Sequence, residues 1–254
     1  MRSSITIWTL LFATLFSFTM ARKPAAFYLA GDSTTAAQSS DGGGWGVGFL
    51  KTLARGAIGT DLGYNGDTTA SFVSGGAWAN VIDAVSRSKA EFEPYVTIQF
   101  GHNDQKNNSG VTRSEYQTNL QSLAENVTAA GGTPVLVTPL SRRNFNSSGL
   151  VIEDLAEQRN ITITVAESLG VSYIDLNKAS TMYLDAIGQN LSATYNRVSD
   201  DYTHLNAVGS VVFGTLVSWL LLTTTSLGGA LEPYTIPSAA IIDAIENGTY
   251  IYPS

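Results

Sequence analysis

The stretch Tyr95-Val96-Thr97-Ile98-Gln99-Phe100 (YVTIQF) leads directly into Gly101 and is short, apolar and rich in β-branched and aromatic residues. These properties are typical of a buried strand. Residues 114–130 then carry apolar side chains at helical spacing and end at Gly131-Gly132, a stop signal for a helix. This part of the sequence therefore predicts a strand followed by a helix.

The same alternation extends on both sides of this pair. We expect strands at residues 25–30, 61–65, 135–138 and 171–176, and helices at 45–55, 78–87, 152–169 and 208–222. Parallel strands need crossover connections, so this order predicts a parallel sheet with helices on both faces. The predicted fold class is α/β, a three-layer α/β/α sandwich of the flavodoxin-like type.

Composition excludes several classes of protein. With 254 residues, of which 44% are hydrophobic and 14% charged, the chain can bury a large core, so it is neither disordered nor a coiled coil. The net charge is −7 and no run of Lys and Arg occurs, which argues against a nucleic-acid partner. The chain has no cysteine, which excludes disulfides, thiolate nucleophiles and iron–sulfur clusters. We expect a single domain over residues 22–254.

The N-terminus has the pattern of a secretory signal. Arg2 precedes an apolar run at residues 5–18, and Ala21 is the small residue at the expected cleavage point. The apolar run is too short for a membrane anchor, so we expect residues 1–21 to be removed and the protein to be secreted, with no membrane attachment afterwards. Six Asn-x-Ser/Thr sequons predict glycosylation sites at Asn107, Asn126, Asn146, Asn160, Asn190 and Asn247.

The sequence has only two histidines, His102 and His204, which limits the choice of a general base. Asp201 lies three residues before His204, where a tight turn could place its carboxylate against the imidazole. His102 has Asp104 nearby, but residues this close in a loop more often point apart. The G-x-S-x-G elbow, the G-x-G-x-x-G fingerprint and the Walker A pattern do not occur.

Polar clusters follow the expected strands, where parallel sheets place their ligand groups. They are residues 31–33 (GDS), 65–67 (NGD) and 101–104 (GHND), and a fourth cluster, 201–204 (DYTH), precedes the last apolar stretch. In combination these clusters resemble the four sequence blocks of the SGNH, or GDSL-like, hydrolases. Residues 28–34 (YLAGDST), 44–46 (GWG) and 100–104 (FGHND) are similar to the rhamnogalacturonan acetylesterase branch. The lack of cysteine departs from many secreted members and concerns stability rather than chemistry.

The resemblance implies a catalytic role for each block. Ser33 is the nucleophile, His204 is its base, and Asp201 orients the imidazole. The backbone N–H groups of Ser33 and Gly66 and the side-chain amide of Asn103 form the oxyanion hole. Asp32 is expected to bond within its own loop and so present Ser33. The mechanism requires no metal and no organic cofactor.

The resemblance and the secretion signal together imply an acetylated polysaccharide substrate. Acetylated pectin carries galacturonate carboxylates, so we expect substrate contacts from cations near the site, Lys106, Arg142 and Arg143, with His102 also facing the substrate. Added salt should then weaken a preference for such a polymer. We expect a monomer. Two other functions stay open: a secreted lipase or general carboxylesterase, and a non-catalytic carbohydrate-binding protein on the same scaffold.

Overall fold

Strand β1 (Ala25–Gly31) is buried along its whole length because its alternate side chains enter two separate cores. Phe27 and Leu29 lie in one hydrophobic cluster, and Tyr28 and Ala30 lie in the other. A strand that is covered on both faces is typical of a parallel sheet with helices on each side. The structure is a computed structural model that describes residues 22–39 and 42–253, so the signal peptide expected at 1–21 lies outside the described residues.

The central sheet has five parallel strands in the order β4-β1-β5-β6-β7. Besides β1, the sheet contains β4 (Ile58–Asp61), β5 (Glu93–Gln99), β6 (Thr133–Val137) and β7 (Ser172–Ile174), and β1 itself pairs with β4 and β5. Within this sheet the strands are thus arranged 2-1-3-4-5 by their order in the chain, which is the flavodoxin-like order. The predicted fold class is confirmed.

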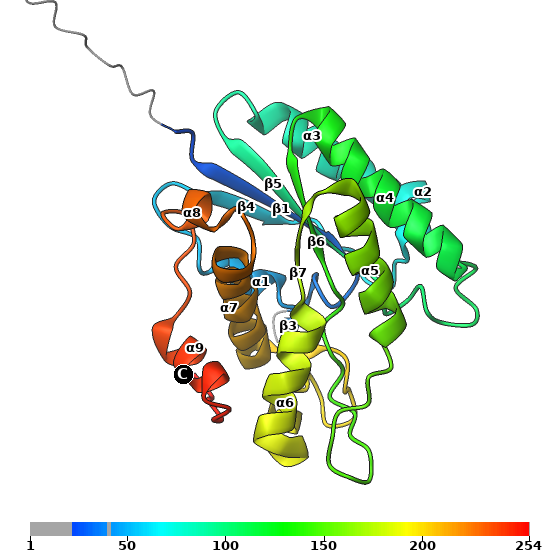
Figure 1. Ribbon diagram of the computed structural model, residues 1–254, viewed down its shortest axis with the longest axis vertical. Helices are drawn as coiled ribbons and strands as arrows, with labels where there is room; N and C mark the ends of the chain where they lie inside the picture. The colour runs from blue at the N-terminus through cyan, green and yellow to red at the C-terminus, as the bar shows by residue number, and fades with distance from the viewer. Residues whose placement is uncertain (1–21, 40–41, 254) are drawn as a thin grey trace, which may run out of the picture.

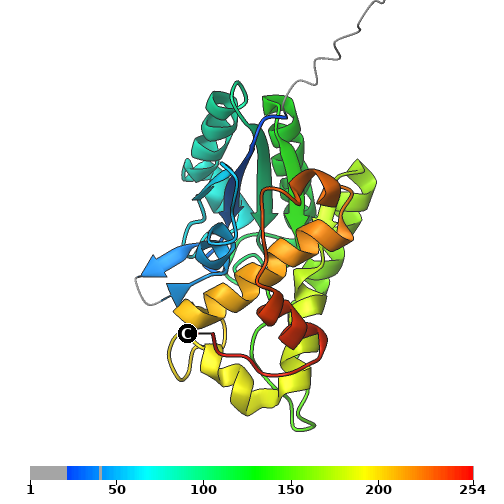
Figure 2. The ribbon, with the colours of Figure 1, turned by 90° about the vertical axis from the view of Figure 1, so that its left-hand side faces the viewer.

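Helices cover both faces of this sheet (Figure 1). The core on one face includes residues of α2 (Thr69–Ser74), α3 (Ala77–Ser88), α4 (Arg113–Ala130) and α5 (Ala156–Leu169). The core on the other face includes residues of α1 (Gly46–Leu50), α6 (Leu176–Ser192), the 3₁₀ turn η1 (Ala193–Tyr195) and α7 (Ala207–Thr224). Two short helices, α8 (Gly228–Leu231) and α9 (Ala239–Glu246), pack against α7 (Figure 2).

Helix α7 fills the space between the sheet and the C-terminal helices. It is the one helix in the described ranges with the length and apolar composition to cross a membrane, and 61% of that stretch is buried inside the fold. Gly214 of α7 lies directly against Gly48 of α1, which lets the two helix backbones approach closely. Residues 208–222, where the sequence predicts a helix, therefore belong to a helix of the core.

The bounds of several expected elements differ from the structure, and those of the helix at 45–55 and the strand at 61–65 differ most. The helix expected at residues 45–55 ends at Leu50, and Arg55 and Gly56 have positive φ angles of 48° and 80°, which a right-handed helix does not allow. The strand expected at 61–65 is β4, which ends at Asp61 where the expected strand begins. Residues 62–65 instead continue past the edge of the sheet as a loop.

A small second sheet joins residues 37–39 and 42–43, near the first strand, to residues 205–206, just before α7. It consists of β2 (Ala37–Ser39), β3 (Gly42–Gly43) and β8 (Leu205–Asn206), all antiparallel. In its register Gly43 pairs with Leu205, the residue directly after His204. The segment that follows Ser33 is therefore fixed to the segment that carries His204.

The side chains of all six sequon asparagines are exposed on the surface. Each of these positions is therefore accessible to a glycosylating enzyme, as the sequence analysis requires of them. Their modification stays a prediction.

Candidate active site

Residues 32–36, called here the serine loop, form a tight turn directly after β1. The backbone N–H groups of Thr35 and Ala36 both donate to the carbonyl oxygen of Asp32, at 3.0 Å each. The Asp32 carboxylate turns back and accepts hydrogen bonds from the Thr34 backbone at 2.9 Å and the Thr34 hydroxyl at 2.7 Å. These bonds hold Ser33 at the carboxyl end of β1, where its residue surface is 7% exposed.

Residues 44–46 (GWG) hold the serine loop from the other side. The Gly44 N–H donates to the Ala36 carbonyl at 2.8 Å, and the Trp45 N–H donates to the Thr34 carbonyl at 2.9 Å. A Cβ atom on Gly44 would lie 2.2 Å from the Thr34 carbonyl carbon, so only glycine permits this approach. The GWG motif is thus a clamp for the loop that carries the serine.

Ser33, His204 and Asp201 are linked in sequence by short contacts. The Ser33 Oγ atom lies 2.9 Å from His204 Nε2, and His204 Nδ1 lies 2.8 Å from Asp201 Oδ2. An ionised carboxylate only accepts hydrogen bonds, so the proton of the neutral imidazole is on Nδ1 and Nε2 is free to accept from the Ser33 hydroxyl. This is the arrangement that a serine nucleophile and its base require.

The pKa of Asp201 favours the ionised form. Burial of the carboxyl group acts to raise its pKa, but hydrogen bonds from the backbone and imidazole of His204 and from the Thr203 backbone outweigh it and lower the pKa below the ordinary value. The negative charge therefore persists at neutral pH, where it can stabilise an imidazolium formed during catalysis.

Arg143 supports the loop that carries this pair, residues 196–205, called here the histidine loop. Its guanidinium donates to the His204 carbonyl at 2.7 Å and to Asn196 Oδ1 at 2.6 Å, and the residue is 1% exposed. Burial lowers the pKa of Arg143 to about 9, against the opposing effect of the negative charge on Asp201. The expectation that Arg143 contacts a substrate was wrong, because the side chain faces the protein interior.

The other two cations also have partners within the protein. Arg142 forms an ion pair with Asp154 at 2.6 Å, donates to the Thr203 hydroxyl at 3.2 Å, and has a side chain that is 15% exposed. Lys106 is exposed, and its ammonium donates to Asn103 Oδ1 at 2.6 Å. Arg142 is thus paired with a carboxylate of the protein itself, whereas Lys106 is bonded to a neutral amide.

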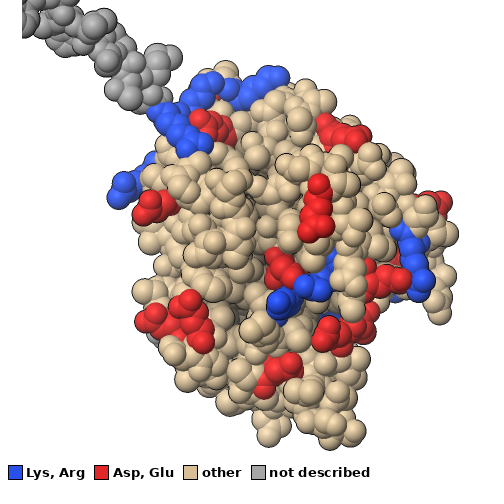
Figure 3. Space-filling view, in the orientation of Figure 1, with Lys and Arg blue, Asp and Glu red and all other residues tan. Residues whose placement is uncertain are grey.

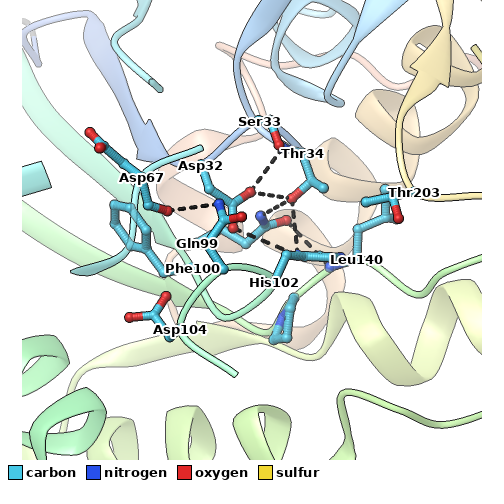
Figure 4. Close-up of polar contacts among 12 residues, drawn as sticks. Asp32, Ser33, Thr34, Asp67, Gln99, Phe100, His102, Asp104, Leu140 and Thr203 are labelled. Atoms are coloured by element: carbon cyan, nitrogen blue, oxygen red, sulfur yellow. Dashed lines mark hydrogen bonds and ion pairs between the residues drawn. The ribbon is translucent and has the colours of Figure 1, made fainter. Parts of the chain in front are cut away.

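His102 lies beneath the serine loop rather than facing solvent (Figure 4). It is 2% exposed, and its Nδ1 atom lies 3.4 Å from the Thr34 hydroxyl and 3.7 Å from Asp32 Oδ2. Asp104 points away and accepts from the backbone and hydroxyl of Thr69, at the start of α2. The expected substrate contact by His102 is therefore corrected: its burial prevents contact, and the side chain shapes the site from below.

A buried polar network under the serine loop was not foreseen. The Gln99 side chain accepts from Trp45 Nε1 at 2.8 Å and donates to the Thr34 hydroxyl at 2.5 Å, and it is completely buried. Figure 4 shows Gln99, Thr34, Asp32 and His102 gathered at this point. The available signal was a lone amide in the otherwise apolar strand YVTIQF, since buried polar groups need partners.

The two other expected oxyanion donors lie at the same end of the sheet. The Tyr64 N–H donates to the carbonyl of Gly31 at 2.9 Å, and Tyr64 begins a turn that contains Gly66 at φ 83°. A side chain at this position would be strained, so the turn requires glycine. The carbonyl of the next residue, Asp67, accepts from Asn103 Nδ2 at 2.9 Å. The structure thus gathers Gly66 and Asn103 beside the serine loop.

Residues 29–211 match the sequence model of the GDSL-like Lipase/Acylhydrolase family. The chain belongs to this family. The resemblance drawn from the sequence blocks is confirmed, and with it the classification of the chain as an ester hydrolase of the SGNH type.

Other members and structures resemble this acylhydrolase over most of its length. The rhamnogalacturonan acetylesterase RhgT of Bacillus subtilis (strain 168) is 28% identical over 214 residues, which are 78% of this chain and 90% of RhgT. The structure of the protein YXIM of Bacillus subtilis has a TM-score of 0.72 at 22% identity. The match covers 82% of this chain and 58% of the longer YXIM chain. Axe2, an acetylxylan esterase of Geobacillus stearothermophilus, has a TM-score of 0.56 at 18% identity, covering 79% of this chain and 94% of its own. Both structures share the acylhydrolase fold.

Proposed function

We propose that this protein is a secreted serine esterase that removes O-acetyl groups from a plant cell-wall polysaccharide, with acetylated rhamnogalacturonan as its main substrate. Residues 22–254 act as a single, monomeric catalytic domain after removal of residues 1–21. The observation that carries the proposal is the chain of contacts from Ser33 Oγ to His204 Nε2 and from His204 Nδ1 to Asp201. The name of the relative RhgT supports the choice of polymer.

The geometry gives each residue one step of the reaction. His204 Nε2 accepts the Ser33 proton as Oγ attacks the acetyl carbonyl carbon. The resulting oxyanion is bound by the N–H groups of Ser33 and Gly66 and by the Asn103 amide. His204 then returns the proton to the sugar oxygen, the alcohol leaves, and water cleaves the acetyl-enzyme by the same route. No step of this mechanism requires a metal ion. Within residues 22–39 and 42–253, the His, Asp and Glu side chains form no group of three or more that could hold one.

A polar cavity with room for a saccharide adjoins the segment that follows Asn103, and none of the reacting residues lines it. A cavity of about 710 Å³ is lined by residues 104–107, 109–114 and 116 and by Asp154, Glu157 and Gln158. Most of these side chains are polar, which suits the hydroxyl groups of a sugar better than a long acyl chain. Because Lys106 donates to Asn103, this cavity begins next to one of the proposed oxyanion donors.

The first experiment measures hydrolysis of 4-nitrophenyl acetate. Ser33→Ala and His204→Ala should each lower kcat at least about a thousandfold, and the double variant should be little worse, because members of one triad act as a unit. Ser226→Ala, which changes an exposed serine in the loop after α7, is the matched control and should keep the wild-type rate. A Ser33→Ala protein with wild-type activity would exclude the proposed nucleophile.

The second experiment compares substrates. Acetate release from acetylated rhamnogalacturonan should exceed release from acetylated xylan, and both should exceed cleavage of long-chain acyl esters. Faster cleavage of long acyl chains would assign the protein to the lipases, and binding of polysaccharide without any acetate release would make it a carbohydrate-binding protein.

A further inference from the structure

The side-chain amide of Asn103 is held at both of its ends. Its oxygen accepts a hydrogen bond from the Lys106 ammonium at 2.6 Å, and its nitrogen donates to the Asp67 carbonyl at 2.9 Å. An ammonium only donates and a carbonyl only accepts, so these partners allow one orientation of the amide and exclude the flipped one. Asn103 is 6% exposed, which leaves it little freedom to rearrange.

This arrangement leaves one hydrogen of the amide uncommitted by these two contacts. The NH₂ group has two donors, and the bond to Asp67 uses one of them. The remaining N–H is the one available for an oxyanion. The amide is therefore already aligned before a substrate arrives, which is the condition under which a donor stabilises a transition state most strongly.

The positive charge of Lys106 adds to this alignment. A charge-assisted hydrogen bond to the amide oxygen draws electron density from the nitrogen, and successive hydrogen bonds polarise one another. The N–H group consequently becomes a stronger donor to a negative oxygen. Because Lys106 is exposed, water screens its charge, and the effect is smaller than that of a buried cation.

The contact between Lys106 and Asn103 is local, so little chain entropy opposes it. The Lys106 backbone N–H donates to the Asn103 carbonyl at 3.1 Å, and the Lys106 carbonyl accepts from the Ser109 N–H at 2.9 Å. The backbone of the turn thus places the lysine three residues after the asparagine, with its ammonium over the amide oxygen.

We propose that Lys106 is a positioning residue for the reaction: it orients and polarises the Asn103 amide so that its free N–H stabilises the oxyanion. The proposal rests on the esterase function proposed above. It differs from the expectation that Lys106 contacts a substrate carboxylate, because it requires Lys106 for a neutral substrate as well.

The test compares three variants on 4-nitrophenyl acetate, which has no carboxylate. Lys106→Met removes the hydrogen bond and the charge and should lower kcat about tenfold with little change in KM, since the oxyanion exists only in the transition state. Lys106→Gln, which keeps a donor without the charge, should lie between Met and wild type, and Lys106→Arg should restore most of the rate. Lys89→Met is the control. Lys89 is also an exposed lysine with one hydrogen bond from its ammonium, to the Ala130 carbonyl, but it lies at the opposite, amino end of the sheet.

Two further measurements separate positioning from a general structural effect. The affinity for phenylboronic acid, which forms a tetrahedral anion on a serine nucleophile, should weaken in Lys106→Met in parallel with kcat/KM. The amide resonances of the Asn103 side chain should shift in the NMR spectrum of Lys106→Met and stay in place in Lys89→Met.

Wild-type activity reports on the proposed function, and the ratio between the variants reports on Lys106. An active wild type with Lys106→Met at the same rate on the neutral ester overturns the inference alone. A loss confined to galacturonate polymers assigns Lys106 to substrate contact and also overturns it. Unshifted Asn103 resonances would contradict the inference without any use of activity.

Discussion

At the scale of single residues, Arg143 places a guanidinium group inside the protein. Its guanidinium holds the His204 carbonyl and the Asn196 side chain from a position that is 1% exposed. The His204 imidazole and its partner Asp201 are both in the segment that Arg143 holds. Arg143 therefore contributes to the stability of the histidine loop and, through the loop, to the alignment of the base.

Arg143→Met should destabilise the protein and slow it. The change removes the Arg143 donor from the Asn196 side-chain oxygen and one of two donors from the His204 carbonyl, and we expect the free energy of unfolding to fall by about 3 kcal/mol. Urea denaturation measures this loss, and kcat on 4-nitrophenyl acetate measures the misalignment of His204. Arg87→Met breaks an ion pair whose Arg87 side chain is 80% exposed, and it should change the stability by less than about 0.5 kcal/mol. Equal unfolding midpoints for both variants would contradict the role of Arg143.

Asp61, at the end of β4, should make stability fall as pH rises. Burial raises its pKa from 3.8 to about 6, against hydrogen bonds from the Gly63 and Ala37 backbones. The folded protein thus retains a proton that the unfolded chain releases, so the stabilising effect is complete below about pH 4 and is lost as pH passes 6. The loss is up to about 3 kcal/mol, from about 1.4 kcal/mol per pKa unit.

The pKa values of Asp32 and Asp201 are lowered, so the stability that these two residues contribute is lost as pH falls rather than as it rises. The effect of Asp61 is therefore read from the difference between the wild type and Asp61→Asn, measured by urea unfolding at pH 4.5 and 7. The wild type should lose more stability than the variant over this interval. A carboxyl carbon resonance of Asp61 that titrates near pH 4 would refute the shift.

The residues of the site differed in how well the sequence predicted them. With two histidines and a carboxylate three residues before one of them, the chemistry left few alternatives, and the structure brings Ser33, His204 and Asp201 together. His102 and Arg143 were misjudged for one physical reason. Polar residues in loops are usually exposed, and only the packing of distant loops over these two buries them.

At the scale of elements, α1 and α7 depend on the absence of side chains where they meet. A Cβ on Gly48 would lie 1.8 Å from the Ser210 carbonyl oxygen, and a Cβ on Gly214 would lie 2.1 Å from the Phe49 nitrogen. Both neighbours are backbone atoms and cannot rotate away. The two helices can therefore lie this close only with glycine at these positions.

Gly48→Ala and Gly214→Ala should each lower the free energy of unfolding by about 3 kcal/mol or more, because the overlap forces the helices apart. Gly229→Ala, in α8, is the control, since a Cβ there meets nothing within 4 Å. The control should be neutral or stabilise by up to about 1 kcal/mol, as alanine favours a helix. Thermal unfolding of the three variants checks this, and a neutral Gly48→Ala would show that α1 can shift freely.

Helices with regularly spaced apolar residues and clear end signals could be predicted from the sequence. Helices without such a pattern, which depend on packing against the rest of the fold, could not. Helix α4 has apolar residues at regular spacing, a Thr112–Glu115 capping box and a glycine stop. Helix α6 was missed, and it carries a Gly188 with φ 77° that interrupts its pattern. The six-residue α2 begins with a Thr68–Ser71 capping box and is too short to show a repeat.

At the scale of the whole molecule, the net charge of −7 opposes an acidic polymer. On the face in Figure 3, acidic side chains are scattered over a largely uncharged surface. Near the site, Arg142 is paired with Asp154 and Arg143 is buried against the histidine loop, while Lys106 is bonded to the neutral Asn103 amide and keeps its charge. The protein as a whole should therefore repel galacturonate rather than attract it.

Added salt should accordingly raise kcat/KM for acetylated rhamnogalacturonan. Increasing the salt from 0.01 to 0.1 M shortens the Debye length from about 30 to about 10 Å and should raise the rate roughly threefold by screening the repulsion. The sequence alone predicts the opposite effect of salt, because it does not reveal the partners of Arg142 and Arg143. The rate on neutral 4-nitrophenyl acetate should stay constant over the same range. A rate on the polymer that falls with salt would show that a cation does engage the substrate.

The pairing of β3 with β8 also has a consequence in time. Ser33 and His204 are 171 positions apart, and the strand that ties their loops together begins only at Leu205. A ribosome that adds about 5–20 residues per second needs roughly 10–35 s to pass from one to the other. Throughout that interval the nascent chain contains Ser33 but neither His204 nor the strand that fixes the segment carrying His204. Under the proposed mechanism, ester cleavage therefore requires synthesis to pass Leu205, and shorter nascent chains should be inactive.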